Sequence, residues 1–219
     1  MIKGLIFDLD GTLIDSIKDI TTSANLALKD YNYPTQNEDI VRLHTGNGFR
    51  KLIKELLPID SNDELIDEVT KVYTNYYAKH YMDETSDYEG IHELLRLLQK
   101  ENIKIAVNSN KKNEYTTNLM KKIFDDIEFV ATIGERENIK NKPDPTSALE
   151  IINLMKLNKD EVMYVGDSEV DMKTGLNAGI KICACLWGFR TKEELEIFKP
   201  DVMVNKPIEI YNYIKEINK

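Results

Sequence analysis

Short apolar runs alternate with amphipathic stretches over most of this chain, and this alternation limits the possible folds more than any other feature. The runs have the length and bounding residues of buried strands, whereas the stretches between them carry apolar residues at helical spacing. Strands that alternate with helices form a parallel sheet, because each helix carries the chain back by a right-handed crossover. The sequence therefore predicts an α/β fold with a Rossmann-like parallel sheet. The expected strands are residues 5–9, 103–107, 129–133, 162–165, 180–186 and 202–204.

One long segment, residues 16–84, interrupts the alternation and carries only helical patterns. We expect it to form a helical cap inserted into an α/β core made of residues 1–15 and 85–219. Ser16 and Asp19 have the spacing of a capping box at the start of its first helix. Four tyrosines near its end are expected to pack in the core of the cap, with a ligand-binding wall as the alternative: Tyr73, Tyr76, Tyr77 and Tyr81.

The composition excludes several classes of protein. Apolar residues make up 42% and charged residues 31% of the 219 residues, which is ordinary for a globular protein. The net charge of −9 and the lack of a dense basic stretch argue against nucleic-acid binding. The N-terminus resembles neither a signal peptide nor a membrane span, so we expect a soluble cytoplasmic protein. Cys183 and Cys185 fit two buried thiols better than a disulfide.

Four small polar clusters follow the predicted strands. In an open parallel sheet, ligands bind beyond the carboxyl ends of the strands. We therefore expect these clusters, although far apart in sequence, to meet along one edge of the sheet. They are residues 8–12, 108–111, 142–145 and 166–171, the third lying one loop beyond its strand.

The residue types in these clusters suit phosphoryl transfer. Carboxylates that are gathered without partners repel one another and need a cation, and an all-oxygen ligand set favours magnesium. Asp8 could form a phosphorylated intermediate, and Asp10 could protonate the leaving oxygen and then activate water. Ser109 offers a hydroxyl and Lys142 a positive charge to the phosphoryl oxygens, while Gly11 permits a close backbone approach. Because the chain is acidic, such local cations are needed to attract an anionic substrate.

The run Phe7-Asp8-Leu9-Asp10-Gly11-Thr12-Leu13-Ile14-Asp15 resembles the signature of the haloacid dehalogenase superfamily. Ser109, Lys142 and residues 166–171 match its later motifs in order. The resemblance implies that Asp8 is nucleophile and metal ligand, and that Asp10 is the acid/base with its carbonyl on magnesium. It further implies the roles of three other residues: Asp167 as third ligand, Asp171 just outside it, and Thr12 positioning Asp10.

Within the superfamily, the chain is most similar to the phosphoglycolate phosphatase-like group. Residues 46–48 in the cap and the segment Trp187-Gly188-Phe189 resemble stretches of that group. The resemblance implies a magnesium-dependent phosphatase of a small phosphorylated metabolite, with 2-phosphoglycolate favoured over a sugar phosphate or pyrophosphate. The expected substrate contacts are Gly11, Thr12, Asn110 and Arg50, the last gripping a distal anionic group.

Of four alternatives to phosphate hydrolysis, the residues disfavour two. A dehalogenase or a phosphonate-cleaving enzyme is disfavoured, because the resemblance implies that both lack the acid/base held here by Asp10. A sugar-phosphate mutase keeps both aspartates and stays open. A non-catalytic binding module is the alternative from another class, although no nucleophile or metal ligand is missing. The expected assembly is a monomer or a homodimer, with no membrane or nucleic-acid partner.

Overall fold

The computed structural model describes all 219 residues, and the chain divides into two compact units. The larger unit contains residues 1–14 and 87–219, and the smaller unit contains residues 15–86. The sequence pattern predicts these boundaries after residue 15 and before residue 85. The chain passes between the units through two short strands that pair with each other, β2 (Ile14–Asp15) and β3 (Ser86–Asp87).

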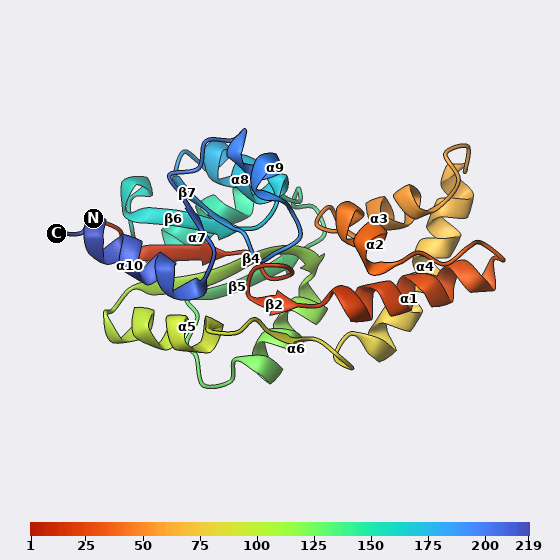
Figure 1. The fold of residues 1–219 in the computed structure, drawn as a ribbon, viewed down its shortest axis with the longest axis horizontal. Helices are drawn as coiled ribbons and strands as arrows, with labels where there is room; N and C mark the ends of the chain where they lie inside the picture. Colours follow the sequence, from red (N-terminus) through yellow and green to blue (C-terminus); the bar gives the residue numbers. More distant parts are fainter. The chain divides into compact units, whose positions relative to one another are not determined.

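The larger unit is built on a six-stranded parallel sheet, as predicted (Figure 1). Its strand order is β5-β4-β1-β6-β7-β8, so β1 lies inside the sheet between β4 and β6. The last residue of β1, Phe7, lies opposite Val107 of β4 and Val165 of β6. The three polar clusters that follow these residues are therefore brought side by side. The strands are β1 (Gly4–Phe7), β4 (Lys104–Lys112), β5 (Ala131–Glu135), β6 (Val162–Gly166), β7 (Lys181–Cys185) and β8 (Val202–Val204).

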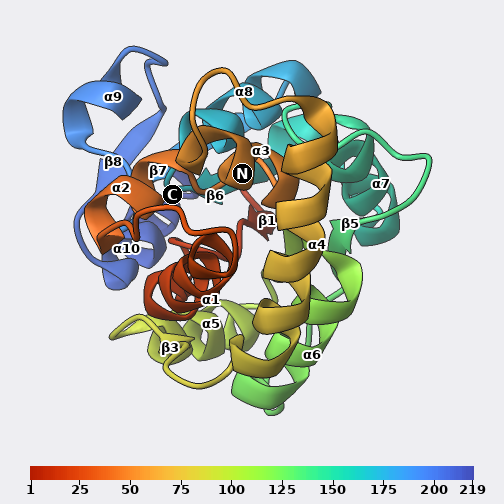
Figure 2. The ribbon, with the colours of Figure 1, turned by 90° about the vertical axis from the view of Figure 1, so that its right-hand side faces the viewer.

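Helices cover both faces of this sheet (Figures 1 and 2). One face carries α5 (Ile91–Lys100), α6 (Asn113–Ile123) and α10 (Pro207–Ile217). The other carries α7 (Thr146–Met155) and α8 (Glu169–Ala178), with the short α9 (Lys192–Glu196) beside α8. A single 3₁₀ turn, Lys159–Glu161, precedes β6. Burial of the sheet on both faces explains why its strands are continuous apolar runs. Cys183 and Cys185 are buried free thiols of β7, as expected.

Strand β4 is longer than the sequence indicated. The apolar run predicts residues 103–107, but the strand continues to Lys112 and contains the polar residues Ser109 to Lys111. Pairing with β1 ends at Val107, and β4 is extended because Lys112 pairs with Glu135 of β5. Its register with β5 shifts between Asn108 and Lys112, as at a bulge beside a functional site.

The smaller unit consists of four helices, α1 (Ile17–Asp30), α2 (Glu38–His44), α3 (Phe49–Leu56) and α4 (Asp63–His80). Helices α1 and α3 both pack against α4 (Figure 2). Tyr73 and Tyr77 of α4 are fully buried, with ring centroids 4.8 and 5.1 Å from that of Phe49. These two tyrosines are therefore core residues of the unit, as expected. Tyr76 instead donates its hydroxyl to Asp30 at 2.9 Å.

The predicted capping box at Ser16 and Asp19 is wrong. Ser16 is the N-cap of α1, but its side chain makes no capping hydrogen bond. The Asp19 carboxylate instead accepts hydrogen bonds from the backbone N–H groups of Glu84 and Thr85, and from the Thr85 hydroxyl. Asp19 therefore ties the beginning of the smaller unit to its end, and these donors satisfy it better than one N-cap amide would.

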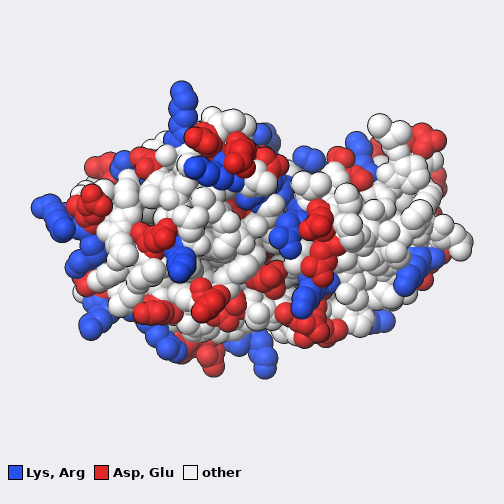
Figure 3. Space-filling view, in the orientation of Figure 1, with Lys and Arg blue, Asp and Glu red and all other residues white.

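The surface carries charges of both signs. On the face in Figure 3, acidic and basic side chains are interspersed, without a large area of a single sign. No helix combines the length and the apolar composition that crossing a bilayer requires.

Gly175 of α8 offers a test of how closely the helices pack on the sheet. Gly→Ala inside a helix normally stabilises by about 1 kcal/mol. Here a Cβ would lie 2.2 Å from Ile182 Cγ2 on β7. We expect Gly175→Ala to lower the free energy of unfolding by about 1–3 kcal/mol, because the contact cannot be relieved without moving the helix. Urea denaturation measures this change. In an Ile182→Ala background the substitution should cost less, and an equal cost in both backgrounds would contradict the packing.

Candidate active site

Asp8 follows β1 at the carboxyl edge of the sheet. Its backbone N–H donates to the carbonyl of Val165 at 2.9 Å, which extends the pairing of β1 with β6. The side chain is buried, and its Oδ1 accepts from the Leu9 N–H at 2.6 Å and pairs with Lys142 Nζ at 2.8 Å. Both contacts fall on one oxygen. Oδ2 is therefore the atom available to react.

Lys142 reaches Asp8 from the loop between β5 and α7. The side-chain amide of Asn110 holds its backbone on both sides: Nδ2 donates to the Lys142 carbonyl at 3.1 Å, and Oδ1 accepts the Lys142 N–H at 2.8 Å. Lys142 Nζ donates to Asp171 Oδ1 at 2.7 Å. Asn110, expected to contact substrate, thus uses its carboxamide to place the lysine. A substrate contact of Asn110 stays a prediction.

Asp171 and Asp167 complete a buried acidic cluster, and their oxygens have different partners. Asp171 lies in the first turn of α8, where its Oδ2 accepts from the N–H and the hydroxyl of Ser168 at 3.1 and 2.6 Å. Asp167 accepts from the Thr12 hydroxyl at 2.8 Å on Oδ1 and from the Phe189 N–H at 2.8 Å on Oδ2. Thr12, expected to position Asp10, therefore gives its hydroxyl to Asp167. Asp171 is tied to Lys142, whereas Asp167 has only neutral hydrogen-bond donors.

This cluster fits a hard metal ion. Carboxylate oxygens of Asp8, Asp167 and Asp171 lie within 4.8 Å of one another, and one ammonium, that of Lys142, contacts two of them, Asp8 and Asp171. Three carboxylates and one ammonium leave two negative charges in excess, which a divalent cation would balance. The backbone also makes room, since a Cβ on Gly11 would lie 2.3 Å from Asp167 Oδ2. Oxygen ligands of this kind suit magnesium.

The crowding perturbs the pKa values of the cluster. Burial, followed by the charge of Asp171, raises the pKa of Asp8 well above its usual value, against the opposing effect of Lys142. Burial and Asp171 also raise the pKa of Asp167, to about 7. For Lys142, burial opposes the charge, but Asp171 and Asp8 outweigh it and raise the pKa well above normal. Without a further cation, Asp8 and Asp167 therefore tend to take up protons.

Asp10 points to a different partner. Its Oδ1 lies 2.7 Å from the Nζ of Lys111, whose side chain is only 1% exposed. The backbone N–H of Lys111 donates to Ser109 Oγ at 3.1 Å, and Ser109 is also buried. Sequence reasoning gave Lys111 no role of its own, because it treated residues 108–111 as a polar cluster after the strand and not as part of it. A strand extended to this residue would have put Lys111 on the same face as Ser109, two positions earlier.

Arg50 lies in the smaller unit, at the start of α3. Its Nε and Nη2 donate to Asp67 Oδ1 at 2.6 Å and to Asp63 Oδ1 at 2.7 Å, and the arginine is half exposed. A guanidinium held by two carboxylates would have to leave them to grip a substrate. Its predicted substrate contact stays a prediction.

Known proteins resemble this chain in sequence and in fold. A model of the family described as haloacid dehalogenase-like hydrolase matches residues 5–185. The chain belongs to this family. It is 31% identical to a phosphoglycolate phosphatase of Aquifex aeolicus over 94% of the chain and 93% of that protein. It is 28% identical to the pyrophosphatase PpaX of Listeria monocytogenes serotype 4a, over 98% and 97% respectively.

This chain is also similar to a solved structure, both in fold and in sequence. The protein from Lactobacillus delbrueckii subsp. bulgaricus, provisionally assigned as a phosphoglycolate phosphatase, superposes with a TM-score of 0.89. It is 28% identical, and the match covers 97% of this chain and 98% of that one. The chain is thus a phosphatase-type member of the haloacid dehalogenase-like hydrolases, with the α/β core that its motifs predicted.

The pKa of Asp167 predicts how stability depends on pH without metal. A carboxyl whose pKa rises from 3.8 to about 7 on folding binds its proton more tightly in the folded state. Its contribution to stability is then fully present below pH 3.8 and is lost as the pH rises towards 7. With chelator present, the free energy of unfolding from urea titrations should be lower at about pH 8 than at about pH 5.5. Asp167→Asn should flatten this dependence.

Asp160→Asn is the matched control, because Asp160 is exposed in the turn before β6. This variant should keep the pH dependence of the parent protein. If Asp167→Asn kept it too, the cluster would not be under the electrostatic stress described here.

Proposed function

We propose that this chain is a magnesium-dependent phosphatase that hydrolyses a small phosphate monoester through a phosphorylated Asp8. The observation that carries the proposal is the buried cluster of three carboxylates, two of them paired with Lys142, in which Asp8 keeps one oxygen available. Asp8, Asp167 and the backbone carbonyl of Asp10 would hold the ion. When bound, magnesium would balance the excess negative charge and withdraw electrons from the phosphoryl oxygens.

The protein's own groups account for the two steps of the reaction. Asp8 Oδ2 attacks the phosphorus, the bond from phosphorus to the leaving oxygen breaks, and Asp10 gives that oxygen a proton. Water then attacks the same phosphorus and gives a proton to Asp10, and phosphate leaves as Asp8 is regenerated. Splitting one difficult displacement in two in this way is the usual advantage of a carboxylate nucleophile.

Two further groups support the phosphoryl group during both steps. Lys142 holds Asp8 Oδ1 in place and offers its positive charge beside the reacting oxygen. Ser109 lies at the same edge of the sheet and can donate its hydroxyl to a phosphoryl oxygen. Charges and donors that are fixed before the reaction stabilise the transition state without reorganising.

Lys111 favours a substrate whose leaving group is itself an anion. It contacts Asp10, the residue proposed to protonate the leaving oxygen, so its ammonium lies on the leaving-group side. A carboxylate or phosphate on the leaving group could share this ammonium with Asp10, as Asp8 and Asp171 share that of Lys142. 2-Phosphoglycolate and pyrophosphate both have such a group, and relatives of this chain are named for each. We favour 2-phosphoglycolate, with pyrophosphate as the second candidate and a sugar phosphate as the third.

Asp8→Asn tests the nucleophile. An amide of the same shape cannot attack phosphorus, so we expect phosphate release to fall by about 10³-fold or more, with the fold retained. Malachite-green assays with magnesium measure activity, and circular dichroism measures folding. The matched control is Asp144→Asn, since Asp144 follows Lys142 by two residues but accepts from Thr146, outside the cluster. Substantial turnover in a folded Asp8→Asn protein would rule Asp8 out as the nucleophile.

A substrate panel tests the anionic leaving group. We expect 2-phosphoglycolate to rank first in kcat/KM, and hexose phosphates and a neutral aryl phosphate to rank below it. Lys111→Met should reduce kcat/KM for 2-phosphoglycolate about 10-fold more than for the aryl phosphate, because only the former loses a charge partner. Arg50→Ala, assayed in parallel, tests the other candidate cation. If hexose phosphates ranked first, or Lys111→Met affected both substrates equally, the proposed substrate class would be wrong, although the nucleophile could still be Asp8.

A further inference from the structure

Three consecutive residues after β7 reach the acidic cluster, although they contain no group typical of a metal site. The first, Trp187, donates its indole Nε1–H to the backbone carbonyl of Thr12 at 3.0 Å. The Thr12 hydroxyl donates in turn to Asp167 Oδ1 at 2.8 Å. Thr12 therefore links the Trp187 indole to the Asp167 carboxylate, because its carbonyl accepts from the indole and its hydroxyl donates to the carboxylate.

The next two residues approach Asp167 directly. The backbone N–H of Phe189 donates to Asp167 Oδ2 at 2.8 Å. Gly188 brings the backbone against this carboxylate, since a Cβ there would lie 2.3 Å from both the Gly11 carbonyl oxygen and Asp167 Cβ. Residues 187–189 thus fix one oxygen of Asp167 directly and the other through Thr12.

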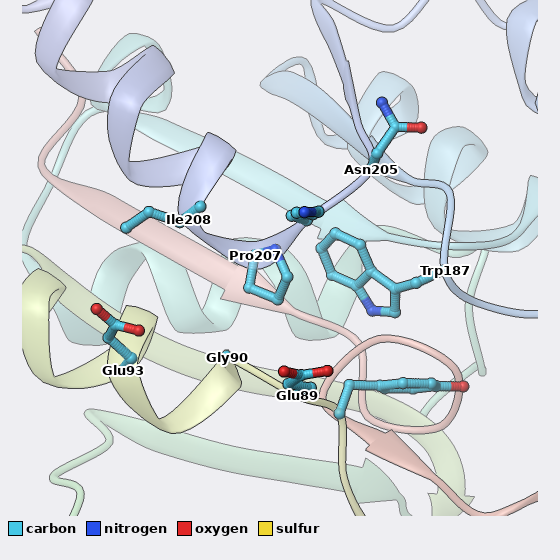
Figure 4. A pocket seen from close by; sticks show the side chains of 9 residues that line it. Glu89, Gly90, Glu93, Trp187, Asn205, Pro207 and Ile208 are labelled. Atoms are coloured by element: carbon cyan, nitrogen blue, oxygen red, sulfur yellow. The ribbon is translucent and has the colours of Figure 1, made fainter.

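The surroundings of Trp187 indicate that packing alone does not explain it. The side chain is only partly buried, and it lines a pocket of about 350 Å³ at the beginnings of α5 and α10 (Figure 4). Pro207, the first residue of α10, lies across this pocket from the ring (Figure 4). An indole nitrogen can only donate, and here its hydrogen bond joins Trp187 to the loop that carries Asp8 and Thr12.

We propose that Trp187 is a positioning residue that sets the affinity of the site for its metal ion. A carboxylate with hydrogen bonds to both oxygens cannot rotate freely, so it loses less conformational freedom when it binds a cation. Outer groups that orient metal ligands typically contribute 10- to 100-fold to metal affinity or activity. The inference rests on the proposed function for the identity of the metal, whereas the contacts are independent of it.

The test uses the fact that Trp187 is the single tryptophan of the chain. Trp187→Phe removes the donor and keeps an aromatic ring. Biosynthetic replacement of tryptophan by 3-benzothienylalanine changes this one side chain only and keeps its bicyclic shape without the N–H. If the smaller phenylalanine of Trp187→Phe disturbs folding, the protein with 3-benzothienylalanine still provides the test. Magnesium affinity is measured by calorimetric titration and by the rise of the melting temperature with magnesium.

Both proteins should bind magnesium about 10-fold more weakly than the parent. At saturating magnesium, kcat should stay within about threefold, because the indole of Trp187 donates to Thr12 and not to Asp8 or Asp10. Thr12→Val, which removes the hydroxyl from Asp167, should also weaken binding. Its effect and that of Trp187→Phe should not add, since the two groups act in one chain of hydrogen bonds.

Ile208→Ala is the matched control, because Ile208 lines the same pocket but its side chain has no group that can donate a hydrogen bond. It should leave magnesium affinity unchanged. If the benzothienyl protein bound magnesium within twofold of the parent, the inference would be overturned. If the parent itself bound no magnesium, the proposed function would fail instead, so the two failures can be told apart.

Discussion

The buried ammonium of Lys142, shared between Asp8 and Asp171, is the interaction on which the rest of the site depends. A charge buried in this way is stable only if it is paired and hydrogen-bonded, and two carboxylates supply both. The surrounding structure serves to keep the pair in place, because Asn110 fixes the lysine backbone and Ser168 holds the far oxygen of Asp171. The consequence for chemistry is that Asp8 has one oxygen restrained and one left to react.

The same arrangement opposes the stability of the protein. Burial and mutual repulsion raise the pKa values of Asp8 and Asp167, so the cluster is under electrostatic stress whenever it holds no further cation. Active sites commonly retain such stress, since optimal stability and optimal function require different side chains. Here the parallel sheet holds the repelling carboxylates in place. The cluster follows the ends of β1 and β6, which pair from Gly4 with Val162 to Phe7 with Val165. A rigid frame is needed to keep like charges together.

Residue patterns predicted the sheet, the inserted helices and the meeting of four polar clusters, because strand direction alone determines where strand ends lie. They could not predict local partners. Asp19 has the spacing of a capping residue, but it binds backbone amides 65 and 66 residues later. The sequence gives no sign that Lys111 is buried. Its burial follows from the continuation of β4 past the apolar run, which only the structure shows. Arg50 has the charge expected of a substrate contact, but only the fold shows the two aspartates that hold it.

Asp171 and Asp167 differ in their partners, because Asp171 pairs with an ammonium whereas Asp167 accepts from neutral donors. The Lys142 ammonium balances the charge of Asp171, whereas no ammonium contacts Asp167. The Thr12 hydroxyl and the Phe189 N–H lower the pKa of Asp167, but burial outweighs them, so the pKa still stands at about 7. These neutral donors therefore orient the Asp167 carboxylate but supply no positive charge to balance it. A bound cation can supply that positive charge, and uncharged residues such as Trp187, which donates to Thr12, are proposed to adjust how strongly it binds.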